Sequence, residues 1–136
     1  MNVSRIALAA LAALVAYFIV GGTFFAVPAM SVEFAKYPAI YRTGDAINSV
    51  MAVGVLGILL AISVAAVIFA RMHPGGAGLQ AGIRFGVILA LFQLGSFVLH
   101  NYMLLNIGSR LAMLQGVAYM AEWVVVGVVI SLVYRG

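Results

Sequence analysis

Four long apolar stretches constrain this chain more than any other feature of its sequence. They cover residues 6–27, 46–70, 82–105 and 111–134. An α-helix needs about 20 mainly apolar residues to cross a hydrocarbon core of about 30 Å. A helix also satisfies its own backbone hydrogen bonds, as lipid requires. The sequence therefore predicts an all-α integral membrane protein, with four helices in a single domain over residues 1–136.

The composition supports lipid as the solvent and excludes several other classes. Only 7% of the residues are charged, against about 25% in a typical soluble domain. The formal net charge is +4, but the basic residues are scattered singly, and a nucleic-acid binder would need a basic cluster or stripe. The chain has no cysteine, which excludes disulfides and thiolate metal sites. The lipid bilayer is the expected partner, and nucleic acid is not.

The three connections predict an up-down bundle. Residues 31–44 mix tyrosines and basic residues with apolar ones, which favours the membrane surface. Residues 73–78 are mostly helix breakers, and residues 106–109 form a tight link. Short links make neighbouring helices antiparallel.

The basic residues indicate an orientation. One side of the predicted bundle holds Arg5, Arg71, Arg84 and Arg135, and the other holds Lys36, Arg42 and Arg110. Because the cytoplasmic side carries the excess of Lys and Arg, both termini are expected in the cytoplasm.

Polar residues gather in the last two predicted spans, at helical spacing. Gln93, Ser96 and His100 share one face of the third span, and Gln115, Tyr119 and Glu122 share one face of the fourth. In an antiparallel hairpin, residues equally far from the turn lie at similar levels. The predicted pairs are Gln93 with Glu122, Ser96 with Tyr119, and His100 with Gln115.

Glu122 is the most informative member of this predicted seam. It lies about 18 Å from the turn at 1.5 Å per residue, near the middle of the bilayer. An isolated carboxylate there costs on the order of 3 kcal/mol, so it must face protein or water. A protonated Glu122 could exchange two hydrogen bonds with the Gln93 amide. His100 and Asn101 lie closer to the end of the third span, where water can reach the imidazole and its charge can change near neutral pH.

No metal or cofactor site is expected. His73 and His100 lie near opposite surfaces and cannot share an ion within one chain. A haem held by His100 from two copies is an alternative, although a lone membrane histidine is more often simply hydrogen-bonded. The sequence contains no phosphate-binding glycine loop, zinc-protease helix or serine elbow.

The last two spans also resemble a known family. The similar segments are Phe85-Gly86, His100-Asn101-Tyr102, Ala118-Tyr119 and Val126-Gly127. They resemble the C-terminal half of small bacterial four-span proteins in the domain-of-unknown-function 1761 family. The first half lacks the Trp-rich turn expected there. The resemblance implies a four-span protein of the bacterial plasma (inner) membrane and implies no chemistry.

Three functional hypotheses follow. The leading one is a homo-oligomeric unit that binds a ligand, or carries a small solute or protons, at the polar seam between spans three and four. Its site residues are Glu122, Gln93, Tyr119, His100, Ser96, Gln115 and Asn101. The second is a non-catalytic accessory subunit of a larger membrane complex, docked through small residues such as Gly54 and Gly57. The third is an intramembrane enzyme on a lipid or isoprenoid, with Glu122 as the acid and His100 or Tyr119 assisting. In a purely structural interpretation, hydrogen bonds in the seam only hold the third and fourth spans together.

Overall fold

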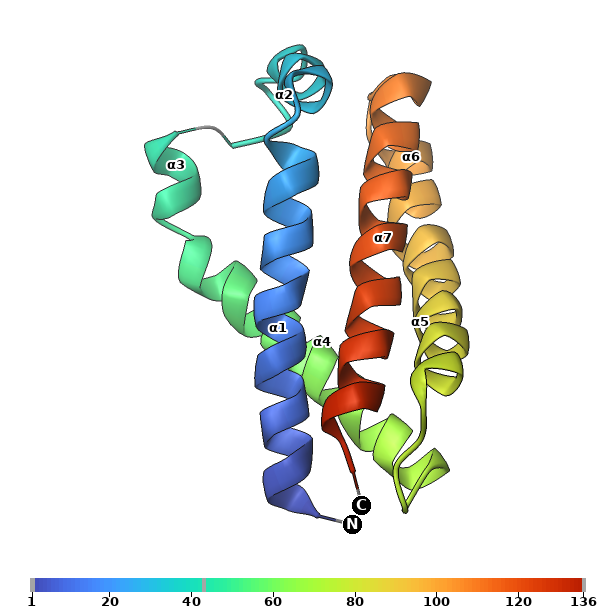
Figure 1. Ribbon diagram of the computed structural model, residues 1–136. Helices are drawn as coiled ribbons and strands as arrows, with labels where there is room; N and C mark the ends of the chain where they lie inside the picture. The colour runs from blue at the N-terminus through green and yellow to red at the C-terminus, as the bar shows by residue number, and fades with distance from the viewer. Residues whose placement is uncertain (1, 43, 136) are drawn as a thin grey trace.

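The computed structural model describes residues 2–42 and 44–135, and within them it is all helical, with no strand (Figure 1). Four spans are long and apolar enough to cross a membrane. They are α1 (Val3–Phe25), α4 (Met51–Met72), the third span Leu79–Leu104, and α7 (Ser109–Val133). The third span consists of α5 (Leu79–Gln93), η1 (Leu94–Leu99) and α6 (His100–Leu104). The predicted all-α four-helix architecture is confirmed.

The chain runs up and down between two ends of the bundle. Both termini lie at one end, and the short helix α2 (Pro28–Ala35) lies at the other (Figure 1). Large apolar side chains cover much of the outer surface, including Phe92, which is 72% exposed. Such a surface is unfavourable in water and suits hydrocarbon. The membrane assignment rests on this surface and on the length and composition of the helices.

Helix α7 is the centre of the bundle and packs between α1 and α5. Its contact with α5 depends on three glycines. A Cβ atom on Gly86 or Gly127 would collide with backbone of the facing helix, and one on Gly82 would also meet Ser131. Gly82 and Gly86 form a small-xxx-small pattern, which lets two membrane helices approach backbone to backbone. Dispersion contacts, rather than a polar seam, hold this hairpin together.

Helix α4 is packed along only half of its length. Its C-terminal half buries Ile62, Ala66 and Phe69 in the core that α1 and α7 share. In its N-terminal half, Gly54 and Gly57 have open space around them. The predicted span 46–70 starts too early, because a break at residues 49–50 separates α3 (Asp45–Asn48) from α4.

The third span contains a π-helical turn, η1. A π-turn closes i→i+5 bonds and amounts to about one extra residue, so later side chains rotate by about 100° relative to a continuous α-helix. The Ser96 hydroxyl donates to the Phe92 carbonyl at 2.6 Å within this region. Residues before and after η1 therefore do not share the face that a 3.6-residue period predicts.

The connection after α1 caps the end of the bundle farthest from the termini. The buried Glu33 of α2 accepts a hydrogen bond from Lys36 at 2.6 Å and faces Arg110 Nε of α7 at 3.4 Å. The Tyr37 hydroxyl accepts a hydrogen bond from the Gly108 N–H at 2.7 Å. The segment predicted to lie on the membrane surface is thus partly helical and is tied to the start of α7.

Candidate functional site

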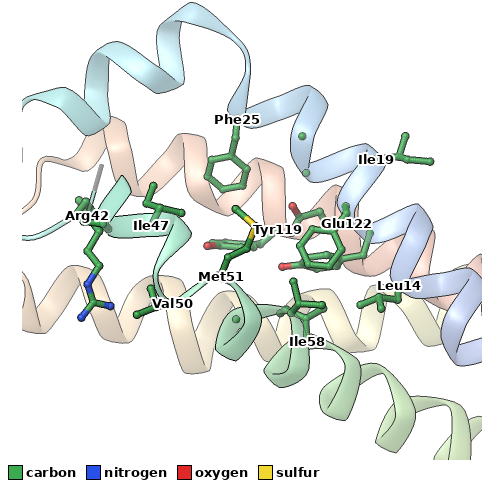
Figure 2. Close-up of a pocket in the computed structure, with 18 of the residues that line it drawn as sticks. Leu14, Ile19, Phe25, Arg42, Ile47, Val50, Met51, Ile58, Tyr119 and Glu122 are labelled. Atoms are coloured by element: carbon green, nitrogen blue, oxygen red, sulfur yellow. The ribbon is translucent and has the colours of Figure 1, made fainter. Parts of the chain in front are cut away.

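A large groove lies between α1, α7 and the N-terminal half of α4. Its volume is about 1700 Å³, above the roughly 300–1,000 Å³ of a typical small-molecule pocket. Apolar side chains make up most of its lining, and residues 38–42 line one end. Figure 2 shows Tyr119 and Glu122 between Phe25 of α1 and Ile58 of α4, with Arg42 at the far end. Its long walls belong to helices that are long and apolar enough to cross a membrane.

Glu122 is the acidic group of this groove. It lies one residue beyond the midpoint of α7, and its side chain is only 1% exposed. Tyr17 of α1 lies next to its carboxyl group. The carboxyl oxygen Oε2 has no hydrogen-bond partner among the described residues. Buried polar atoms are almost always hydrogen-bonded, so this oxygen marks a site for a missing partner.

A glycine makes room for the carboxyl group. A Cβ atom on Gly21 of α1 would collide with Glu122 Oε1. Tyr17 and Gly21 are four residues apart, so both lie on the same face of α1. This face of α1 therefore provides both a hydroxyl group and a space for Glu122.

Several aromatic residues near Glu122 in the sequence or in the groove lining contact one another. The Tyr119 ring makes an edge contact with Phe25 at 6.0 Å between centroids and another with Phe97 at 5.4 Å. The Tyr17 ring contacts Trp123 edge to face at 6.0 Å. Tyr17, Phe25 and Tyr119 all line the groove. The acid is therefore set in an aromatic and apolar wall.

The groove is polar again at the end nearer α2. There the Gln115 amide donates to the Tyr41 hydroxyl at 3.4 Å, next to Arg42. Glu122 lies seven residues further along α7, which is about 10 Å deeper by helical rise. A polar mouth and a deep acidic end are thus separated by apolar lining.

The three predicted pairs across the last hairpin are wrong. The structure records no hydrogen bond between Gln93 and Glu122, and Glu122 faces α1 instead of the third span. Gln115 pairs with Tyr41 and not with His100. Ser96 bonds to its own helix and not to Tyr119. Two features explain this: η1 rotates the later residues of the third span, and the glycine crossing occupies the α5 face of α7.

The structure separates the predicted site residues into two groups. Tyr119 and Glu122 line the groove, and the buried Gln115 lies near its mouth. The four remaining residues belong to the third span and do not line the groove. They are Gln93 and Asn101, which are half-buried, and Ser96 and His100, which are exposed.

Sequence reasoning missed the contribution of α1 and of residues 38–42. Tyr17 is a lone hydroxyl-bearing aromatic residue in the middle of an apolar span, with Gly21 one turn later. That pattern was a usable signal. The structure gives no basis for a metal centre in the part of the chain it describes, where no three His, Asp or Glu side chains come together.

No protein family, curated protein or solved structure matches this chain. The resemblance to the domain-of-unknown-function 1761 family thus stays an expectation from sequence. Functional inference depends on the groove itself.

Proposed function

We propose that the groove between α1, α4 and α7 binds a small, largely apolar molecule dissolved in the bilayer, with Glu122 as its polar anchor. The observation that carries this proposal is the unpartnered Oε2 of a fully buried carboxyl group in the wall of an open cavity. The predicted binding seam between spans three and four is replaced by this groove. Ligand binding, or transport of a small solute or protons, remains the leading class.

The cost of burying Glu122 favours a functional role for this residue over a purely structural one. An ionisable side chain in mid-membrane is costly and marks a site of function by default. A purely structural Glu122 would be expected to satisfy both carboxyl oxygens within the bundle. Its second oxygen has no partner among the described residues.

Transport would suit an assembly of several copies in a bacterial plasma membrane, with both termini in the cytoplasm. The exposed Gly54 and Gly57 of α4 supply small residues through which a second copy could approach. In such an oligomer, each groove would be covered on its open side. The Glu122 carboxyl could then carry a proton between the two surfaces.

Reconstituted vesicles test this function. Wild-type protein is expected to move protons in response to a pH gradient, measured with a pH-sensitive dye trapped inside, and Glu122→Gln is expected to abolish the movement. Asp45→Asn is the matched control, because Asp45 is an exposed acid that does not line the groove. Absence of both proton movement and any copurifying small molecule in native mass spectrometry would contradict the proposal.

An accessory subunit is the second candidate. It is favoured by the unpacked N-terminal half of α4, where a helix of a partner protein could lie. Purification of the native protein in mild detergent would separate the two: a stable larger partner supports the subunit, and a clean homo-oligomer supports the ligand-binding unit. The intramembrane enzyme has less support, because His100 does not line the groove beside Glu122.

A further inference from the structure

The acidic residues of the chain differ in how their charge is compensated. Glu33 faces Lys36 and Arg110, and Asp45 is exposed in α3. Neither Asp45 nor Glu122 has a basic side chain within ion-pair distance among residues 2–42 and 44–135, and of these two Glu122 is the buried one. A buried carboxyl group is stable either in its neutral, protonated form or as a carboxylate paired with a positive charge. The groove is where that charge can come from outside the chain.

The aromatic rings near Glu122 favour a positively charged group as well. The face of an aromatic ring attracts a cation within about 6 Å, and the attraction strengthens where water is excluded. Tyr17 and Tyr119 line the groove near the carboxyl group, and Phe25, which also lines it, contacts the Tyr119 ring. Anions gain nothing from such faces, and a neutral ligand leaves the carboxyl group protonated and makes no use of its charge.

The rest of the groove restricts the shape and polarity of this cation. Its lining is mainly apolar, and its long walls belong to helices that are apolar and long enough to cross a membrane. A small hydrated ion would lose its water here without enough oxygen ligands to replace it, because the described residues hold no cluster of metal-ligating side chains. A bulky cation with apolar substituents would instead bury its surface against Leu14, Met51 and Ile58.

We propose that the groove binds a lipophilic organic cation, held by the Glu122 carboxylate and the surrounding aromatic rings. This inference rests on the proposed function, since it names the ligand class of the same groove. Binding exchanges one positive charge for another. The cation enters from the membrane, and the proton on the Glu122 carboxyl group leaves to water, so the net charge of the site is unchanged.

The neighbouring titratable groups do not compete for this role. Tyr17 of α1 and Tyr119 of α7 face the carboxyl group as hydroxyls. The groove's basic side chain, Arg42, is exposed and lies near the level of Gln115, about 10 Å from Glu122 along the bundle by helical rise. It is too distant to neutralise Glu122. Raising the pH is therefore expected to strengthen cation binding until Glu122 is fully deprotonated.

Three probes of similar size and different charge test the inference: tetraphenylphosphonium, tetraphenylborate and triphenylphosphine oxide. Radiolabelled tetraphenylphosphonium should bind the full chain in lipid nanodiscs, and more tightly at higher pH. At pH values where Glu122 is protonated before binding, one proton should be released for each cation bound. Glu122→Gln should weaken its binding about 100-fold, as expected for the loss of one partner of a buried charge pair. Trp123 is the single tryptophan of the chain and contacts Tyr17, so its fluorescence should change when the groove fills.

Two further variants keep the test decisive. Glu122→Asp retains the charge and should retain most of the cation binding, whereas Asp45→Asn should bind like the wild type. The cation proposal would be wrong if triphenylphosphine oxide or tetraphenylborate bound equally well. It would also be wrong if a folded Glu122→Gln variant bound the cation fully. Either result would leave the proposal of a ligand-binding groove standing. If none of the three probes binds and no proton moves in vesicles, both the ligand class and the proposed function are wrong.

Discussion

Gly21 of α1 lies directly against the carboxyl group of Glu122 of α7, so closely that a Cβ atom at Gly21 would collide with Oε1. The two residues come from the first and last spans of the chain. Their contact places the acid at the wall of the groove and not against the third span. It also allows the site to be tested through a residue that carries no functional group.

Gly21→Ala should displace the Glu122 side chain. The added methyl group meets Oε1, and overpacking of this kind costs about 1–3 kcal/mol. Gly22→Ala is the matched control, because open space surrounds its added Cβ atom. Unfolding in mixed micelles would measure both variants. Equal stability of the two would contradict the contact between Gly21 and Glu122.

Gly86→Ala should loosen the hairpin formed by the third and fourth spans. Its Cβ atom would meet backbone atoms of Val124, which cannot move without shifting α7. A loss of about 1–3 kcal/mol is expected, and more if the two helices separate. Gly57→Ala, in open space on α4, should stay within about 1 kcal/mol of the wild type. Chemical denaturation monitored by Trp123 fluorescence would compare them.

Tyr37→Phe should weaken the attachment between the α2 region and the start of α7. It removes the acceptor of the Gly108 N–H hydrogen bond, which joins residues 71 positions apart. The loss is expected to be about 1 kcal/mol. Tyr102→Phe serves as the control, since Tyr102 is 45% exposed on the third span. Faster amide exchange at residues 107–109 in Tyr37→Phe alone would report the broken contact.

The orientation can be measured with single cysteines, because the chain has none of its own. Gly75→Cys lies between α4 and α5 at the end that holds the termini, and Asn106→Cys lies at the opposite end. A membrane-impermeant maleimide on intact cells should label Asn106→Cys, and should label Gly75→Cys only after permeabilisation. The reverse result would place the termini outside, and labelling of both from one side would contradict the four-span topology.

The spans were predictable because the length of an apolar run is a local property. The first predicted span, residues 6–27, corresponds to Val3–Phe25 in the structure. The break before Met51 and the π-turn Leu94–Leu99 were not predicted, since both depend on local backbone hydrogen bonding that side-chain hydropathy does not report. The close helix crossing at Gly82 and Gly86 was not predicted.

The site was predictable only in part. Helical periodicity correctly grouped Tyr119 and Glu122 on one face of α7. It could not say which neighbouring helix that face meets, because α7 packs against both α1 and α5. The choice depends on the close approach at Gly86 and Gly127, which turns the polar face of α7 toward Tyr17. The register of the last hairpin alone therefore predicted the third span, and not α1, as the helix that faces Glu122.

Helix α4 is held in the bundle at its C-terminal end only. Phe69 and its neighbours pack the last turns of α4 into the core, while the N-terminal half makes few contacts with the bundle. Bending of α4 at its N-terminal end would break few contacts. The width of the groove could therefore change while the core around Ile62 and Ile130 keeps its packing. A groove with one rigid side and one movable helix would accommodate ligands of different size.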